Sequence, residues 1–451
     1  MKIHLIAIGG SAMHNLALAL HHKGYHVTGS DDEIFEPSRS RLEKHGLLPE
    51  KNGWFPEKID KSIDAIILGM HATEDNSELK KAKELGLKIY SYPEYLYEQT
   101  KDKKRVVIAG SHGKTTITSM IMHVLKHCNH EFDYMVGALV EGFDTMVSLS
   151  ENAPVAIFEG DEYLSSTLDK RPKFHLYKPH IALISGIAWD HINVFPTFDI
   201  YKEQFSKFIH LMEPNGSLYY YNGDPELNEL IGKSDAPICF TGYEEHPHMI
   251  SEHETYLLAQ TGSYKLNIFG NHNLQNISGA KLVCNQLGVT DVEFYKAIAT
   301  FKGASKRLQV LRSTQDSTVW LDFAHAPSKV KATIDALKMN YPNRKLIAIL
   351  ELHTFSSLTS GFLEQYSGSM DKADIAIVYY NPETLKHKRL PELQPGKVKA
   401  SFARSDLKTY INSLEMINFL KTTDKENTNI LFMSSGNYDG IDLHELAKSL
   451  I

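Results

Sequence analysis

The stretch RVVIAGSHGKTT, residues 105–116, contains the clearest indication of the fold. Its first half is an apolar strand, and a glycine-containing turn then leads into a helix that starts at Lys114. Backbone N–H groups at a helix start carry partial positive charge and bind phosphate oxygens. The sequence therefore predicts a strand–loop–helix phosphate site made of Gly110, Ser111, His112, Gly113, Lys114, Thr115 and Thr116.

This loop is shorter than the common G-x-x-x-x-G-K-[ST] pattern, because only Ser111 and His112 separate its two glycines. Lys114 can nevertheless reach the β and γ phosphate oxygens, and the Thr115 hydroxyl is placed to bind Mg²⁺. The alternative is a plain turn with an exposed lysine. The flanking strand and helix favour the phosphate loop, so we expect ATP and Mg²⁺ to bind here.

Composition limits the class of protein. The chain has 451 residues, which predicts two to four domains, and a formal net charge of −7 without a long basic run. We therefore expect no nucleic acid and no membrane as the main partner. No apolar stretch is long enough for a transmembrane helix. Three widely spaced cysteines predict no disulfide framework and favour the reducing cytoplasm.

Apolar runs alternate with amphipathic segments along the whole chain, which predicts an α/β fold with parallel sheets. Strands are expected at 3–8, 65–68, 105–109, 155–158, 181–184, 345–350, 375–378 and 430–433, and helices at 11–22, 114–127, 271–287 and 328–339. The polar segments 100–104 and 301–307 predict boundaries between three domains, 1–102, 103–302 and 303–451.

Acidic residues follow a second strand in VAIFEGDEY (155–163). Carboxylates at the end of a strand beside a phosphate loop often supply Mg²⁺ ligands, so Glu159 is a candidate ligand. A solvated acidic loop is the alternative. A third strand ends at Asp190 and His191. A lone histidine is usually no ligand, and on its own His191 predicts nothing.

Two later stretches are weaker signals. FGNHNLQN (269–276) opens a helix, where Asn and His are common capping residues. WLDFAHAP (320–327) places Asp322 and His325 at the carboxyl end of a strand, where open α/β sheets bind ligands. Arg307, next to a proposed boundary, could stabilise a transferring phosphoryl group or form a surface salt bridge.

The N-terminal IGGSAM (8–13) follows a strand and starts a helix, with Asp31 about twenty residues further on. A nucleotide pyrophosphate over Gly9, Gly10 and Ser11 is plausible. The G-x-G-x-x-G pattern is missing, so NAD is poorly supported. An NAD dehydrogenase would also leave the GKTT segment unexplained, and a kinase or nucleotide switch would leave the outer two domains without a role.

Taken in order, nine motifs resemble those of the Mur ligases, the ATP-dependent amide-forming enzymes of peptidoglycan synthesis. They are IGGSAM (8–13), GSD (29–31), AGSHGKTT (109–116), EGDE (159–162), DH (190–191), GNHN (270–273), KRL (306–308), DFAH (322–325) and LHTFS (352–356). That family has its own short phosphate motif. A folylpolyglutamate synthase shares the core, but the Rossmann-like domain before the phosphate loop argues against it.

The resemblance implies a UDP-sugar domain at 1–102, a central P-loop domain at 103–302 and a Rossmann-like ligase domain at 303–451. The implied ATP and metal contacts are Lys114 and Arg307 (phosphates), Thr115 and Glu159 (one Mg²⁺), His191 (a second Mg²⁺), Asn273 (adenine), Asp322 (ribose) and His325 (near the nucleotide). The implied contacts to the other substrates are Gly9, Gly10, Ser11, Asp31, His71, Asn76, Lys170 and Arg171.

The resemblance also indicates the acceptor, which is the amine that the enzyme joins to the carboxylate of the UDP-sugar. The long run EGDEYLSSTLDKRPKFHLYKP (159–179), with DKR at 169–171, is similar to members that join UDP-N-acetylmuramate to L-alanyl-γ-D-glutamyl-meso-diaminopimelate in peptidoglycan recycling. Members that add L-alanine have a shorter run there, and Gly-His-His-Pro where this chain has DFAHAP. L-Alanine stays the alternative acceptor. Several members carry a carbamylated lysine after the DH motif; Lys202 and Lys207 are not clearly in register, and we predict none.

Overall fold

The computed structural model describes residues 1–70, 72–303 and 307–451, so the predicted substrate contact His71 lies outside the described residues. Its strands and helices alternate, which confirms the α/β class. By internal contacts the chain divides into two compact units. The first comprises Met1–Ile187, Thr197–Glu244 and Gly279–Ala297, and the second comprises Ala188–Pro196, Glu245–Ser278 and Ile298–Ile451.

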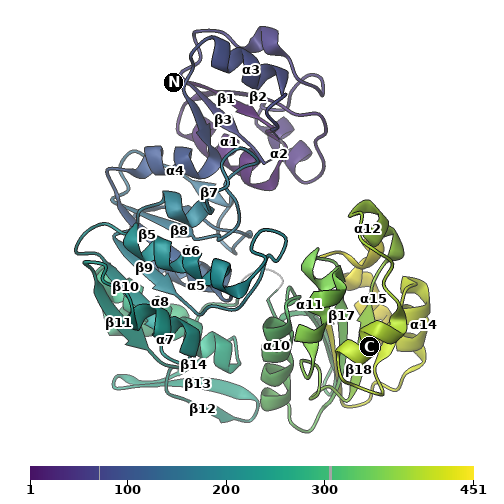
Figure 1. The fold of residues 1–451 in the computed structure, drawn as a ribbon. Helices are drawn as coiled ribbons and strands as arrows, with labels where there is room; N and C mark the ends of the chain where they lie inside the picture. The colour runs from purple at the N-terminus through teal and green to yellow at the C-terminus, as the bar shows by residue number, and fades with distance from the viewer. Residues whose placement is uncertain (71, 304–306) are drawn as a thin grey trace. The chain divides into compact units, whose positions relative to one another are not determined.

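The N-terminal sheet, purple to blue in Figure 1, has four parallel strands in the order β2-β1-β3-β4. Its central strands are apolar because helices cover the sheet. The elements are β1 (Lys2–Ile6), α1 (Ser11–His22), β2 (His26–Ser30), α2 (Ser38–Lys44), η1 (Pro56–Lys58), β3 (Ala65–Leu68), α3 (Ser77–Glu84), β4 (Ile89–Ser91) and α4 (Tyr92–Thr100).

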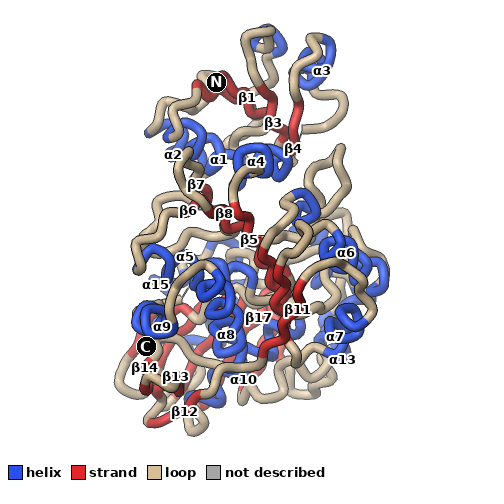
Figure 2. Tube along the Cα trace, turned by 90° about the vertical axis from the view of Figure 1, so that its left-hand side faces the viewer, coloured by secondary structure: helices blue, strands red, loops and turns tan. Residues whose placement is uncertain are grey.

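The central sheet has seven strands in the order β11-β10-β9-β5-β8-β6-β7, and only β7 is antiparallel to its neighbour. Figure 2 shows β5 and β8 side by side. Since β5, β8 and β9 are parallel neighbours, the loops that follow them leave the same edge of the sheet. The strands are β5 (Lys104–Ala109), β6 (Phe132–Met135), β7 (Val147–Ser148), β8 (Val155–Glu159), β9 (Ile181–Ile184), β10 (Ser217–Tyr221) and β11 (Cys239–Tyr243).

Helices flank this sheet. One of them, α5, has a continuous buried face that includes Ile117, Met120 and Val124. The helical elements are α5 (Lys114–His127), η2 (Lys173–Leu176), α6 (Phe198–His210), α7 (Pro225–Gly232), α8 (Asn271–Gln286) and α9 (Asp291–Ile298).

The C-terminal sheet has six strands in the order β15-β16-β20-β17-β18-β19, with only β15 antiparallel. Alternate residues of β17 point to opposite faces, so Leu346 and Leu350 join one buried cluster and Ile347 and Ile349 join another. The strands are β15 (Gln309–Ser313), β16 (Thr318–Asp322), β17 (Lys345–Glu351), β18 (Ile375–Tyr379), β19 (Lys408–Tyr410) and β20 (Thr428–Met433).

Helices cover both faces of this sheet as well. They are α10 (Pro327–Asn340), η3 (Ser356–Leu358), α11 (Ser360–Leu363), η4 (Glu364–Tyr366), α12 (Pro382–His387), α13 (Pro395–Ser401), α14 (Ser413–Thr422), η5 (Tyr438–Gly440) and α15 (Leu443–Leu450). In the described part of the chain, no helix has the length and apolar character needed to cross a membrane.

A small antiparallel sheet, β12 (His248–Ser251), β13 (Glu254–Ala259) and β14 (Gly262–Lys265), is not predicted by the sequence. Its strands are largely exposed, and only β13 contains an apolar run, at 256–259. Glu252 and His253 have positive φ angles of 51° and 67°, as in the tight type I′ turns of hairpins. The hairpin is fastened to α10, since Asn340 Nδ2 donates to the His253 carbonyl at 2.9 Å and His253 Nδ1 lies 2.6 Å from the Asn340 carbonyl.

The predicted elements agree with the structure in type and position. Strands β3 and β9 and helices α1 and α5 have the expected bounds, and the other predicted elements differ by one or two residues at one end or both. Beyond the predicted elements the structure has further strands and helices, among them the antiparallel sheet of β12, β13 and β14.

Candidate active site

The loop between β5 and α5 has the geometry of a phosphate site. Gly110 and Gly113 have φ angles of 117° and 73°, which favour glycine. A side chain at Gly110 would also place its Cβ 2.8 Å from the Ser185 nitrogen. These two glycines let the chain turn directly from β5 into α5, with the helix N-terminus open to an anion.

Lys114 is held in place at the start of α5. Its ammonium donates to the Gly110 carbonyl at 2.8 Å and to Glu162 Oε2 at 2.5 Å. Burial favours a lower pKa, but the charges of Glu162, Asp161 and Glu159 outweigh it and raise the pKa of Lys114. The lysine is therefore a fixed cation at the phosphate loop.

Thr115 and Glu159, the two residues expected to hold one Mg²⁺, lie side by side. The Thr115 hydroxyl donates to Glu159 Oε1 at 2.8 Å, and the Gly137 N–H donates to Glu159 Oε2 at 2.7 Å. Burial raises the pKa of Glu159 despite the hydrogen bond from Gly137 and the charge of Lys114. A hydroxyl and a carboxylate are hard oxygen ligands that fit Mg²⁺, which commonly takes only one or two protein ligands beside phosphate oxygens.

Two side chains in this region were not predicted as site residues. Glu162 is 1% exposed, and its Oε1 accepts a hydrogen bond from the Tyr201 hydroxyl at 3.0 Å. The Tyr201 hydroxyl also lies 2.9 Å from Ser111 Oγ. The acidic run hinted at Glu162, whereas Tyr201 belongs to no motif. Asp161 pairs with Lys173 at 2.6 Å and so has a separate partner.

The remaining predicted ATP contacts belong to the second unit. Asp322 accepts backbone N–H groups from Leu308 and Ala324, each at 2.7 Å, and is buried. The Arg307 guanidinium lies 5.1 Å from the Phe323 ring centre. The described residues thus fix the Asp322 carboxylate and place Arg307 beside the end of the same strand.

Asn273, His191 and His325 also belong to this unit. Asn273 Nδ2 donates to the Phe269 carbonyl at 2.8 Å, which anchors it in the first turn of α8. His191 has a left-handed φ of 56°, and its backbone N–H donates to Asp190 at 2.8 Å. Burial and the nearby Lys329 charge lower the pKa of His325 to about 4, so this imidazole is neutral at pH 7.

The predicted UDP-sugar site centres on a contact between Gly9 and Asp31. The Gly9 N–H donates to Asp31 Oδ2 at 2.7 Å. Burial of Asp31 raises its pKa to about 6. Ser11 starts α1 directly after Gly10, and Asn76 Oδ1 accepts the Leu79 N–H at 3.0 Å as the N-cap of α3.

Lys170 and Arg171 lie in a compact loop between β8 and η2. Arg171 is exposed and Lys170 is too. Arg171 binds Asp169 with contacts of 2.7–3.1 Å and Glu94 of α4 at 2.8 Å. The Thr167 hydroxyl donates to the Ala72 carbonyl at 2.7 Å, so this loop is tied to the N-terminal sheet region.

Another polar cluster lies where β17 and β20 end. Glu351 is 3% exposed, and its Oε2 accepts the Tyr438 N–H at 3.1 Å and the Ser434 hydroxyl. His353 Nδ1 lies 3.9 Å from Glu351 Oε1. This edge of the C-terminal sheet is the kind of position where open α/β sheets bind ligands.

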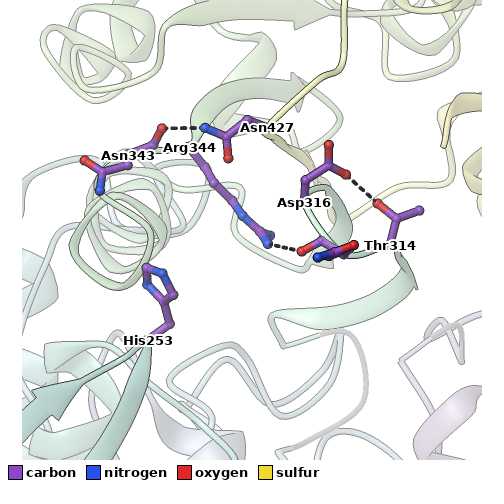
Figure 3. A pocket seen from close by; sticks show the side chains of 7 residues that line it. His253, Thr314, Asp316, Asn343, Arg344 and Asn427 are labelled. Carbon is purple, nitrogen blue, oxygen red and sulfur yellow. Dashed lines mark hydrogen bonds between the residues drawn. The ribbon is translucent and has the colours of Figure 1, made fainter.

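A cavity of about 670 Å³ opens at the opposite, amino ends of β16, β17 and β20 (Figure 3). Its Arg344 guanidinium donates to the Gln315 carbonyl at 3.2 Å and the Thr318 hydroxyl at 3.1 Å. The lining residues are His253, Thr314, Gln315, Asp316, Asn343, Arg344 and Asn427. The predicted site residues are not part of this lining.

A glycine-turned phosphate loop beside carboxylates at the same sheet edge defines a P-loop α/β nucleotide-binding protein. Three family profiles match the chain: Mur ligase family, catalytic domain (residues 2–104), Mur ligase middle domain (108–284) and Mur ligase, glutamate ligase domain (306–436).

Relatives of two kinds are similar to this chain. UDP-N-acetylmuramate–L-alanine ligase of Ligilactobacillus salivarius is 30% identical over 82% of this chain and 81% of the relative. UDP-N-acetylmuramate–L-alanyl-γ-D-glutamyl-meso-2,6-diaminoheptandioate ligase of Haemophilus influenzae is 26% identical over 99% and 98%. The crystal structure of a murein peptide ligase from Psychrobacter arcticus has the same fold, with a TM-score of 0.68 at 22% identity over 100% of this chain and 98% of that one.

The chain belongs to the Mur ligase family. It is an ATP-dependent ligase that joins an acid to an amino acid or peptide, as the sequence resemblance predicts.

Proposed function

We propose that this ligase joins UDP-N-acetylmuramate to the tripeptide L-alanyl-γ-D-glutamyl-meso-diaminopimelate in peptidoglycan recycling, within the cytoplasm. Residues 1–102 would bind the UDP-sugar, residues 103–302 ATP, and residues 303–451 the incoming peptide. The choice of the tripeptide as acceptor rests on the long segment that follows the acidic run 159–162 and contains Asp169-Lys170-Arg171. DFAHAP (322–327) supports the same acceptor.

Lys114 is the central residue of the proposed chemistry. The lactyl carboxylate of UDP-N-acetylmuramate attacks the γ-phosphate of ATP and yields an acyl phosphate and ADP. Lys114 and Arg307 neutralise charge on the transferring phosphoryl group, together with the N–H groups of residues 110–116. A free carboxylate is a poor electrophile, so the phosphate supplies the leaving group that the amide step needs.

The second step forms the amide. The α-amine of the tripeptide attacks the acyl carbon, and the tetrahedral intermediate expels phosphate. In our proposal Asn273 contacts adenine, Asp322 the ribose, and His325 lies near the nucleotide. Thr115 and Glu159 would hold one Mg²⁺ and His191 a second, and the bound metal neutralises phosphate charge.

The UDP-sugar contacts that we propose include Gly9, Gly10, Ser11 and Asp31. Asp31 fixes the loop through its 2.7 Å bond from the Gly9 N–H. Four further residues complete the proposed set, namely His71, Asn76, Lys170 and Arg171. Of these, Arg171 would act by holding its loop to Glu94, a contact of 2.8 Å.

L-Alanine is the second candidate acceptor. The observation that favours it is the 30% identity to the L-alanine ligase of Ligilactobacillus salivarius, against 26% to the tripeptide ligase of Haemophilus influenzae. The two activities share the acyl-phosphate step and differ only in the amine that attacks it.

Phosphate release distinguishes the two. The enzyme is incubated with ATP, Mg²⁺ and UDP-N-acetylmuramate, and L-alanine or the tripeptide is added in separate reactions, with mass spectrometry of the UDP-linked product. Release that depends on the tripeptide supports the proposal. Release with L-alanine alone moves the function to the biosynthetic reaction, and release with neither acceptor contradicts both.

A further inference from the structure

Glu162 and Tyr201 are buried beside the phosphate loop, and the proposed function gives them no role. Tyr201 is fully buried, and Glu162 is 1% exposed. They come from different elements, Tyr201 from α6 and Glu162 from the loop after β8. Burying a carboxylate costs free energy unless the carboxylate is paired. The contact between these two side chains from separate elements therefore indicates a specific polar interaction.

Counting protons gives the direction of each hydrogen bond. An ionised carboxylate only accepts, and a phenol has one proton. The Tyr201 hydroxyl therefore donates to Glu162 Oε1 at 3.0 Å and accepts from the Ser111 hydroxyl at 2.9 Å. The other Glu162 oxygen accepts from Lys114 at 2.5 Å. A chain of hydrogen bonds thus starts and ends in the phosphate loop.

This chain fixes the direction of the lysine ammonium. Of the three Lys114 N–H groups, one donates to the Gly110 carbonyl and one to Glu162. In the described residues these are its two hydrogen-bond acceptors. Because two directions of a tetrahedral group are fixed, the third N–H has a fixed direction as well, and it is the one left for a phosphate oxygen.

We propose that Tyr201 is a positioning residue of the ATP site, which holds Glu162 and, through it, the Lys114 ammonium. Without the hydroxyl, one oxygen of a buried carboxylate loses the bond from Tyr201, and the carboxylate turns toward or tightens on Lys114. The lysine then meets the phosphates in a poorer direction. The inference rests on the assignment of Lys114 to phosphate and is independent of the acceptor.

The test compares two buried tyrosines. We expect Tyr201→Phe to raise the Kd for ADP and the KM for ATP about tenfold, as for loss of a hydrogen bond to a charged group. The KM for UDP-N-acetylmuramate should stay unchanged. Tyr177→Phe is the matched control, because the Tyr177 side chain is fully buried in the same unit and its hydroxyl has no hydrogen-bond partner among the described residues. Calorimetry with ADP and thermal melting of each variant give the values.

A double-mutant cycle tests whether Tyr201 acts through Glu162. In a Glu162→Gln background, Tyr201→Phe should change the Kd for ADP less than twofold. If Tyr201→Phe lowers the melting temperature, a second double-mutant cycle replaces it with Ser111→Ala, which removes the hydrogen bond from Ser111 to Tyr201. Ser111→Ala is made in the wild-type protein and in Glu162→Gln. If Ser111 contacts phosphate directly, Ser111→Ala should change the Kd for ADP equally in both proteins. If Ser111 acts through Tyr201 and Glu162, its effect on the Kd should disappear in Glu162→Gln.

Three results would overturn the inference: equal Kd values for Tyr201→Phe and Tyr177→Phe, effects of Tyr201→Phe and Glu162→Gln that multiply, or an equal rise in the KM for UDP-N-acetylmuramate. If the wild-type enzyme failed to bind ADP at all, the ATP-site assignment would fall together with the inference. Normal ADP binding by both wild type and Tyr201→Phe would overturn the positioning role alone.

Discussion

The hydroxyl of Thr115 donates a hydrogen bond of 2.8 Å to Oε1 of Glu159, so the first helical turn after the phosphate loop and the end of β8 place a hydroxyl and a carboxylate side by side. Burial raises the pKa of this carboxyl. A proton and a divalent cation would therefore compete for Glu159 at higher pH than for an exposed glutamate.

Changing Glu159→Gln should raise the Mg²⁺ concentration for half-maximal phosphate release by at least about tenfold, because a charged ligand becomes neutral. For the wild type this concentration should rise as pH falls, and for the variant it should change less. The control is Thr118→Ala. Thr118 lies in α5, the helix that contains Thr115, and its buried hydroxyl has no hydrogen-bond partner among the described residues. Equal Mg²⁺ requirements in wild type and Glu159→Gln would contradict the ligand assignment.

Removing the loop cation should nearly abolish catalysis. Lys114→Ala is expected to lower the rate of phosphate release by about a hundredfold or more, as for loss of a charge-stabilising donor. Lys207→Ala on α6 serves as control, because this exposed lysine pairs with Glu203 of the same helix at 2.9 Å. A Lys114→Ala enzyme that works at the wild-type rate would refute the phosphate role.

The close contact around Gly9 predicts a substrate-specific defect. A Cβ at Gly9 would lie 2.9 Å from both Asp31 Oδ2 and Ile34 Cγ1, so the loop must shift. Gly9→Ala should raise the KM for UDP-N-acetylmuramate about tenfold or more, with the Kd for ADP unchanged. Gly232→Ala is the control, because an added Cβ there meets nothing within 4 Å. A change in ADP affinity instead would argue against a UDP-sugar site at Gly9.

Asp31→Asn should stabilise the protein at neutral pH. The folded Asp31 has a pKa of about 6, above the ordinary value near 3.9, so the folded state binds a proton more tightly than the unfolded state. Its contribution to stability is thus present below about pH 4 and is lost as pH rises to 6.

The lost stability amounts to roughly 2–3 kcal/mol. Melting temperatures of Asp31→Asn should therefore exceed those of the wild type at pH 7.5, and the two should converge near pH 4. The exposed Asp199→Asn should follow the wild type throughout. Convergence at pH 7.5 and divergence at pH 4 would show the opposite sign and refute the raised pKa.

The polar cluster of Glu351 and His353, where β17 and β20 end, predicts a change in the KM for the amine acceptor. A Cβ at Gly436 would lie 2.7 Å from His353 Nδ1 and 2.8 Å from Glu351 Oε2. We expect Gly436→Ala to raise the KM for the amine acceptor about fivefold or more, with the Kd for ADP unchanged. Gly361→Ala, where a Cβ meets nothing within 4 Å, is the control. Unchanged acceptor kinetics in Gly436→Ala would exclude this edge as the peptide site.

The phosphate loop shows how much of the site can be predicted from residues that are close together in the sequence. An apolar strand, glycines with positive φ and a helix start at Lys114 are all determined within a dozen residues, so the sequence predicts this part of the site. The Thr115–Glu159 contact needed one more step, the parallel pairing of β5 and β8.

Tyr201 could not be predicted in this way. Its role depends on how α6 packs against the sheet, which brings its hydroxyl to Glu162, 39 positions earlier in the chain. The sheet at 248–265 is not predicted by the sequence, because only β13 has an apolar run, at 256–259, and its partners β12 and β14 are mostly exposed. Local patterns therefore predict backbone turns well, and contacts between distant side chains poorly.

The paired bonds between His253 and Asn340 bear on how this gene can be divided. A gene fragment that stops after codon 302 would keep the hairpin but lose its helical counterpart, and the complementary clone would carry α10 without the hairpin. Each product would lack one half of this pair of hydrogen bonds. Designs for split reporters or separate expression should therefore keep both segments on a single polypeptide.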